Sequence, residues 1–205
     1  MESGATTQAL TALGIGIALA AAPGPVQAVL LSESARGGVA RGLRALTGVH
    51  VTFGLLLLFL ALGLTIVAPS GPALRILKMA GGVLLLWLAL DGVRSRSASD
   101  RDAGSRTLSP AIRGALAIVL NPGGWLFAAA VASPLLVTAT QHGGTGGAAL
   151  AAVALVVGAA LGDLGLVLLA GLGLRRAGKE VVRFVRLTLA VVLAGLGLWL
   201  IVDAL

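Results

Sequence analysis

The chain has 205 residues, of which 58% are hydrophobic and only 11% charged, and it contains 30 glycines and no cysteine. This composition excludes an ordinary soluble domain and places the chain among proteins that cross a membrane several times. The absence of cysteine excludes disulfides, thiolate metal sites and thiol redox relays.

The first predicted membrane span, Thr7–Leu31, has a helix breaker in its middle. Residues 6–31 carry no charge and are numerous enough to cross a bilayer, yet Pro23, Gly24 and Pro25 interrupt them. Proline removes a backbone donor and clashes with the preceding turn, and inside hydrocarbon the freed carbonyls need partners in protein or in a water-filled cavity. We therefore expect either an unwound turn with a binding role or a simple kink.

Five more spans follow, and their basic flanks indicate how the chain lies in the membrane. The spans are predicted at Ala45–Val67, Pro72–Asp91, Ile112–Val137, Gly147–Leu174 and Val185–Asp203, with the turn-rich segment 141–147 between the fourth and the fifth. Thirteen of the 15 Lys and Arg residues lie in or beside the connections that follow the first, third and fifth spans, and only Arg75 and Lys78 lie on the other side. The positive-inside rule makes the basic side cytoplasmic. We expect a multi-pass protein of the cytoplasmic (inner) membrane with both termini outside.

This distribution also explains the net charge of +7. The basic residues set the topology and attract anionic lipid headgroups. Nucleic-acid binding would need aromatic side chains among the charges, and the chain has no Tyr and only four Phe. We therefore exclude nucleic acid as a partner and expect membrane lipid as one.

Residues 93–110 form a Ser-, Arg- and Asp-rich cytoplasmic linker between two halves of three spans each, 1–92 and 111–205. Because each half has an odd number of spans, the halves have opposite orientations, as in transporters built from inverted repeats. The second half has its own break, Asn121-Pro122-Gly123-Gly124, and paired breaks indicate a binding site near the membrane centre. The predicted fold is an all-α integral membrane protein of six transmembrane helices in two inverted three-helix repeats, with helices 1 and 4 broken.

Four polar residues within the spans are candidates for solute or proton binding. Gln27 and Asn121 bring side-chain amides to the two breaks, where they can bind a polar solute or simply link two helices. Asp163 lies about 16 Å from the cytoplasmic end of its span, where a charged carboxylate costs about 2.5–3.5 kcal/mol. It is a candidate solute ligand, cation site or proton carrier, against the alternative of a protonated or hydrogen-bonded carboxyl between helices. His50 could titrate in a proton-coupled cycle, although a lone His near the interface is more often a packing residue.

The remaining chemistry does not indicate an enzyme. There is no nucleophile–base arrangement, no phosphate-binding glycine loop and no metal-ligand spacing, since two separated His and one Asp do not make a metal site. We expect no enzymatic activity, no resident metal and no cofactor.

The breaks and the glycines that follow them resemble a known family. After Pro23-Gly24-Pro25, the segment with Gly38 and Gly42 forms a Gly-x-x-x-Gly motif, Gly48 follows in the next span, and Leu120-Asn121-Pro122 forms a second motif. This pattern resembles the LysE/RhtB amino-acid exporters over the whole chain. Small residues let helices approach closely, so Gly38, Gly42 and Gly48 are assigned to helix packing. The predicted solute-binding residues are Pro23, Gly24, Pro25, Gln27, Asn121, Pro122, Gly123 and Asp163, with Asp163 and His50 as proton-coupling candidates.

The resemblance implies efflux of amino acids or related small solutes, driven by the proton gradient through alternating access. The chain departs from the family at two places: Val26-Gln27 follows the first break where Asn is common, and Gly123-Gly124 follows the second where Lys is common. Without that Lys, a substrate carboxylate needs backbone amides or an Arg.

Two alternatives share this composition. A metal or inorganic-ion exporter has the same architecture, and one Asp with backbone carbonyls suits hard cations. A non-transporting membrane scaffold is the third class. In every case the small-residue helix faces permit a homodimer without requiring one.

Overall fold

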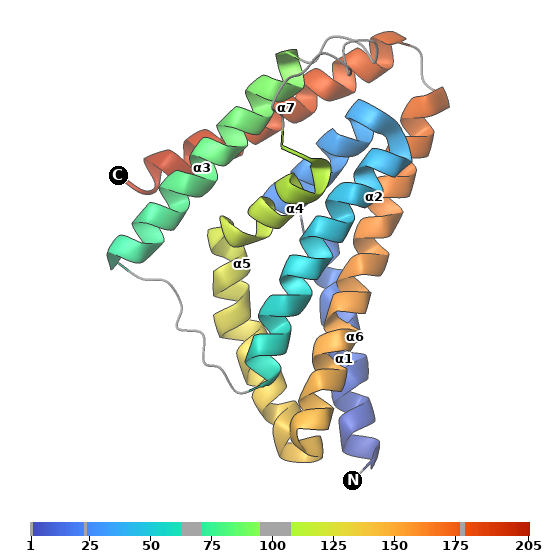
Figure 1. The fold of residues 1–205 in the computed structure, drawn as a ribbon, viewed down its shortest axis with the longest axis vertical. Coiled ribbons are helices and arrows are strands. Elements are labelled where there is room, and N and C mark those ends of the chain that lie inside the picture. Colours follow the sequence, from blue (N-terminus) through green and yellow to red (C-terminus); the bar gives the residue numbers. More distant parts are fainter. Residues whose placement is uncertain (1, 23, 63–70, 95–107, 177–178) are drawn as a thin grey trace.

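The computed structural model describes residues 2–22, 24–62, 71–94, 108–176 and 179–205, and every element in these ranges is a helix. The elements are α1 (Glu2–Ala21), α2 (Pro25–Ala61), α3 (Gly71–Arg94), α4 (Pro110–Val119), α5 (Pro122–Phe127), the π-helical turn η2 (Ala128–Ala132), α6 (Ser133–Arg176) and α7 (Lys179–Val202) (Figure 1). The predicted linker, 93–110, lies mostly outside the described residues. The all-α class predicted from the sequence is confirmed.

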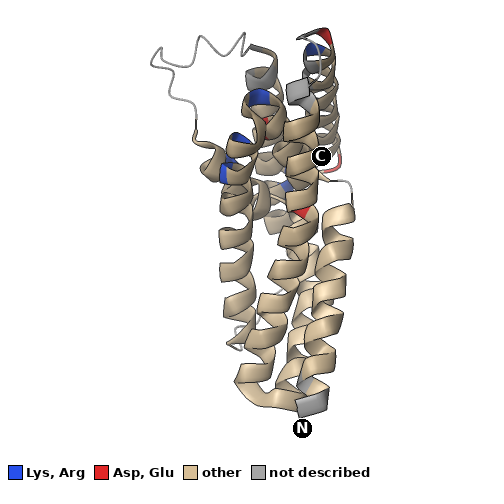
Figure 2. Ribbon diagram, turned by 90° about the vertical axis from the view of Figure 1, so that its right-hand side faces the viewer, with Lys and Arg blue, Asp and Glu red and all other residues tan. Residues whose placement is uncertain are grey.

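Four helical stretches within the described ranges are long and apolar enough to cross a membrane. They are Pro25–Ala61, Gly71–Leu90, Pro122–Gly173 and Arg183–Val202, and two shorter apolar helices cover Thr6–Ala21 and Pro110–Val119. Figure 2 shows the Lys and Arg residues in the half of the molecule farther from the N-terminus, whereas the half nearest to it is free of them over the described residues. The chain is therefore a multi-pass membrane protein; the count of six spans and the outward termini stay predictions.

The two longest helices each reverse direction at a pair of glycines. In α2 the reversal uses Gly37 (φ −147°, ψ 18°) and Gly38 (φ 69°, ψ −166°), and in α6 it uses Gly143 (φ −141°, ψ 16°) and Gly144 (φ 61°, ψ −160°). The second glycine of each pair has a positive φ with an extended ψ, a region open essentially only to glycine. The two turns lie at opposite ends of the molecule (Figure 1), and the second falls inside the predicted divider 141–147.

Glycines also let pairs of helices touch through their backbones. A Cβ on Gly16 of α1 would overlap the Leu155 carbonyl oxygen of α6, and a Cβ on Gly48 of α2 would overlap the Ala111 carbonyl oxygen of α4. In the third pair, a Cβ on Gly82 of α3 would lie 2.6 Å from the Gly197 carbonyl oxygen of α7. Such close packing through small residues is typical of membrane helices.

Each of these three helix pairs joins a helix of the first half of the chain to a helix of the second half. The helix before the first break, α1, packs on the second arm of α6, and the helix before the second break, α4, packs on the second arm of α2. The third helices of the halves, α3 and α7, pack on each other (Figure 1). An inverted repeat would produce such an exchange of partners, and the repeat itself stays a prediction.

Of the glycines assigned to helix packing, Gly42 and Gly48 lie in helix contacts, while Gly38 forms the turn of α2. A Cβ on Gly42 would overlap the Ser34 hydroxyl oxygen and lie 2.7 Å from Val167 of α6. Gly38 has a different reason to be glycine: its positive φ allows the chain to fold back. The Gly-x-x-x-Gly spacing alone does not distinguish these two roles.

Candidate functional site

A cavity of about 250 Å³ lies between the two helix breaks. Its walls come from the α1–α2 break, the second arm of α2, the α4–α5 break and the middle of α6. The polar or backbone-exposing residues of the lining are Gly24, Pro25, Gln27, His50, Asn121, Gly123, Gly124 and Asp163. The other lining residues are Leu19, Ala20, Ala22, Val26, Val49, Phe53, Leu56, Ile118, Phe127 and Ala159.

At the first break, α1 ends at Ala21 and α2 begins at Pro25. Gly24 is fully extended (φ −169°, ψ −176°) and no side chain caps the amides of the new helix. Pro25 suits the first helical position because its missing N–H would have no partner there. The N-terminus of α2 therefore presents its positive dipole end, with backbone amides that no side chain caps, beside the cavity.

At the second break, the side chain of Asn121 begins the new helix. Asn121 is extended, and its Oδ1 accepts a hydrogen bond of 3.0 Å from the Gly123 N–H. The indole N–H of Trp125 donates to the Val119 carbonyl oxygen at 2.8 Å, which satisfies a carbonyl of the helix end. Because Asn121 uses its oxygen for the cap, its NH₂ group remains the part that can serve a solute.

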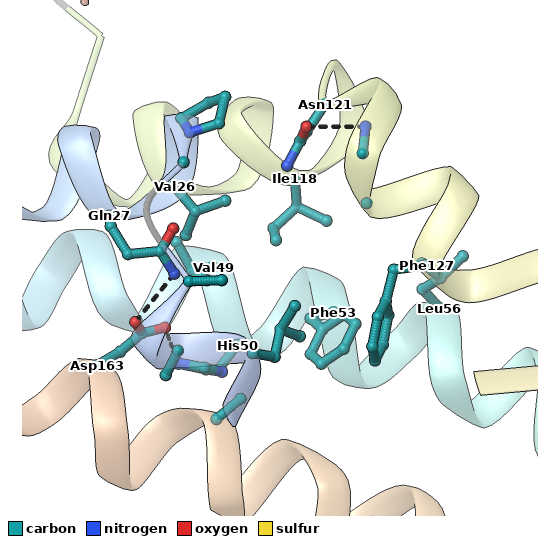
Figure 3. Close-up of a pocket in the computed structure, with 18 residues that line it drawn as sticks. Val26, Gln27, Val49, His50, Phe53, Leu56, Ile118, Asn121, Phe127 and Asp163 are labelled. Atoms are coloured by element: carbon teal, nitrogen blue, oxygen red, sulfur yellow. Dashed lines mark hydrogen bonds and ion pairs between the residues drawn. The ribbon is translucent and has the colours of Figure 1, made fainter. Parts of the chain in front are cut away.

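Asp163 is buried at the cavity wall beside residues from two other helical segments (Figure 3). Its Oδ1 accepts a long hydrogen bond of 3.5 Å from Gln27 Nε2, and its Oδ2 lies 3.2 Å from His50 Nε2. The side chains of Asp163 and His50 are only 3% and 10% exposed. The His50–Asp163 contact has the distance of an ion pair but not the angles of a hydrogen bond, and among the described residues His50 Nδ1 has no hydrogen-bond partner.

In this buried position, an ionised Asp163 is stable only beside a positive charge or hydrogen-bond donors. A carboxylate in an apolar site is costly unless a cation or hydrogen-bond donors accompany it. Gln27 and His50 are the polar side chains that the structure places against it.

A second charged cluster, centred on Glu33, lies near the turn of α2. Its carboxylate accepts a hydrogen bond of 2.6 Å from Arg41 Nε and lies 3.3 Å from Arg113 Nη1 and 3.8 Å from Arg36 Nη1. Arg113, on α4, also lies over the ring of Trp87 on α3, 5.0 Å from its centre. The cluster joins both arms of α2 to α4 and α3.

The sequence reasoning missed Glu33 as a structural residue. It ended the first span at Leu31 and treated the arginines beyond as topology signals. A lone acid between an apolar span and a run of Arg is a signal that could have suggested an ion-pair cluster.

The structure brings most of the predicted site residues together. Gly24, Pro25, Gln27, His50, Asn121, Gly123 and Asp163 all line the one cavity. Pro122 is buried without lining it, and Pro23 lies outside the described residues. Their roles in binding and coupling stay predictions. Within the described ranges, no three His, Asp or Glu side chains gather as metal ligands do.

Comparison with known proteins gives one match. Neither the curated proteins nor the solved structures contain a match to the chain. The LysE type translocator family matches residues 17–204, which is nearly the entire length and includes both breaks, both glycine turns and Asp163. The chain thus belongs to the LysE type translocator family.

Proposed function

We propose that this membrane translocator is a secondary transporter that exports amino acids or related small polar solutes across the cytoplasmic membrane in exchange for protons. The observation that carries the proposal is the buried Asp163 carboxylate, held by His50 and Gln27 in a cavity between two broken helices. Family membership supports export of such solutes. Ionisable groups buried within membrane helices are functional candidates because they are expensive to keep.

The two charged ends of an amino acid fit different parts of this cavity. Its ammonium group pairs with Asp163, where it replaces the contact with His50. Its carboxylate binds the NH₂ group of Asn121 and the exposed amides at the N-terminus of α2, whose dipole favours an anion. These groups take the place of the Lys that follows the second break in many family members.

His50 supplies the coupling to protons. His50 Nε2, 3.2 Å from the Asp163 carboxylate, is the cationic partner of that carboxylate in the proposed exchange. An arriving ammonium group takes its place, and exchange requires that a proton leave the pair at this step. Solute binding and proton binding are thereby mutually exclusive, which is the condition for exchange of one against the other.

Access alternates when the two halves move against each other around this fixed site. The cavity is lined by both breaks, one from each half, so motion of one half against the other changes which end of the cavity is open. The residues of the site come from both halves and stay near the membrane centre throughout.

Transport by purified protein in proteoliposomes tests the proposal. Amino acids, organic amines and metal salts are supplied separately, with and without an imposed pH gradient. We expect gradient-driven amino-acid transport by the wild type and a loss in Asp163→Asn of at least about 30-fold in apparent affinity, corresponding to roughly 2 kcal/mol or more for a buried charge pair.

Asp203→Asn is the matched control, since Asp203 makes an exposed ion pair with Lys78 near the C-terminus. It is expected to transport like the wild type. Wild-type transport rates in Asp163→Asn, or transport of metal salts alone, would refute the proposal.

A further inference from the structure

The cavity has a polar end and an apolar end. Figure 3 shows Asp163, Gln27 and His50 together on one side, and Phe53, Leu56 and Phe127 together on the other. The rings of Phe53 and Phe127 are 6.3 Å apart between centres and inclined by 48°, a favourable aromatic arrangement. Asn121 lies between the two ends (Figure 3).

Formal charge is confined to the polar end. Among the described residues that line the cavity, Asp163 is the sole carboxylate and there is no Lys or Arg. A solute with an ammonium and a carboxylate group therefore finds partners for these two charges only. A third charge on its side chain would be buried against Phe53 and Phe127 without a partner, which carries a large desolvation penalty.

We propose that the transported solute is a neutral amino acid with an apolar side chain, aliphatic or aromatic, which packs against Phe53 and Phe127 while its ammonium group pairs with Asp163. This inference rests on the proposed function and adds the substrate class. Burial of the apolar side chain supplies the hydrophobic contribution to affinity, and the missing counter-charges exclude basic and acidic side chains.

The size of the cavity agrees with such a solute. A volume of about 250 Å³ is far above the roughly 10–15 Å³ of such space that a single water molecule needs. The cavity therefore has room for a small solute such as an amino acid. The apolar end of the cavity holds water poorly, so an apolar side chain placed there displaces little that is strongly bound.

The test is a binding panel on purified full-length protein in lipid nanodiscs, measured by isothermal titration calorimetry. The probes are leucine, methionine, phenylalanine, alanine, lysine and glutamate. We expect leucine, methionine and phenylalanine to bind roughly tenfold or more tighter than alanine, since a few methylene groups are worth this much in an apolar pocket. Lysine and glutamate are expected to bind more weakly than alanine.

A charge placed at the apolar end should reverse the preference. Phe127→Glu supplies a second carboxylate, so we expect it to lose leucine binding and gain lysine binding. Phe127→Leu, which keeps the site apolar, should retain the wild-type order of affinities. The wild-type panel decides the question alone if Phe127→Glu does not fold.

The outcomes separate this inference from the proposed function. Lysine or glutamate binding as tightly as leucine to the wild type would overturn the substrate class and leave amino-acid export standing. No binding of any of the six probes would overturn both.

Discussion

The carboxylate of Glu33 lies 3.3 Å from Nη1 of Arg113, and both side chains are buried although 80 positions separate them in the chain. Removing one partner of a buried ion pair leaves the other charge uncompensated, which costs about 3–5 kcal/mol. We therefore expect Glu33→Gln to lower the free energy of unfolding by about this amount. The measurement is the apparent melting temperature of the purified protein in detergent.

Two further variants show whether the loss comes from this pair. Glu33→Gln/Arg113→Met should be less destabilised than the sum of the single variants, because the fully buried guanidinium of Arg113 is gone. Arg41, whose side chain is 26% exposed, loses its carboxylate partner in both Glu33 variants alike. Asp203→Asn breaks an exposed pair and should cost no more than about 1 kcal/mol. Equal losses in Glu33→Gln and Asp203→Asn would contradict a structural role of the cluster.

The contact between His50 and Asp163 predicts what accompanies solute binding. His50 Nε2 lies 3.2 Å from the Asp163 carboxylate, so a solute ammonium group must take the place of the ring there. The proposed exchange of solute against protons then requires that solute binding release protons. Calorimetry in two buffers of different ionisation enthalpy measures the released protons directly.

His50→Gln should release fewer protons on solute binding than the wild type. His142→Gln is the matched control, since His142 is exposed and bonds only to the Thr138 carbonyl oxygen among its described neighbours. Unchanged proton release in His50→Gln would remove His50 from the coupling mechanism.

The helix breaks and the buried acid could be predicted from the sequence because each conflicts with its surroundings. Proline inside an apolar span leaves backbone carbonyls without partners, and Asp163 places a charge far from any charged neighbour in sequence. Both cost free energy inside a membrane, so both can be recognised from the sequence. His50 carries no such local conflict, so the sequence alone favours a packing role for it. Its partner lies on another helix, 113 residues away, and no local pattern connects the two.

The Glu33 cluster could not be predicted because it depends on a turn. Arg41 reaches Glu33 only because the chain reverses at Gly37 and Gly38, and Arg113 arrives from the second half of the chain. Charged residues beside a membrane span ordinarily lie in water or among lipid headgroups and set the orientation of the span. These charges are buried only because the helices pack around them.

The turn of α6 provides a test of backbone strain without any steric change. Gly144 has φ +61°, Gly146 does not lie in this region, and a Cβ on either would meet no described atom within 4 Å. Gly144→Ala should therefore cost about 1–3 kcal/mol through strain alone. Gly146→Ala should be neutral or slightly stabilising because it removes chain entropy from the unfolded state. Equal melting temperatures for the two variants would contradict the turn geometry.

The crossing of α2 and α4 predicts a steric effect at Gly48. A methyl group there overlaps the Ala111 carbonyl oxygen, which is backbone and cannot rotate away, so Gly48→Ala must push the helices apart. We expect a loss of about 1–3 kcal/mol in unfolding free energy. Gly54→Ala, on the same helix, places its methyl group 3.8 Å from Val156 and should be tolerated. If both variants melt like the wild type, the close approach of α2 and α4 is wrong.

Asn121 combines two roles that one substitution can separate. Its Oδ1 caps α5 through the Gly123 N–H, and its NH₂ group is the proposed donor to the solute carboxylate. Asn121→Asp keeps an oxygen for the cap, and a negative charge near a helix N-terminus is favourable, so the melting temperature should hold. Amino-acid binding should fall, because the donor is replaced by a charge that repels the carboxylate. Asn121→Ala removes both groups and should lose binding together with about 1 kcal/mol of stability. A stable Asn121→Asp that binds leucine like the wild type would place the carboxylate elsewhere, at the amides of α2 alone.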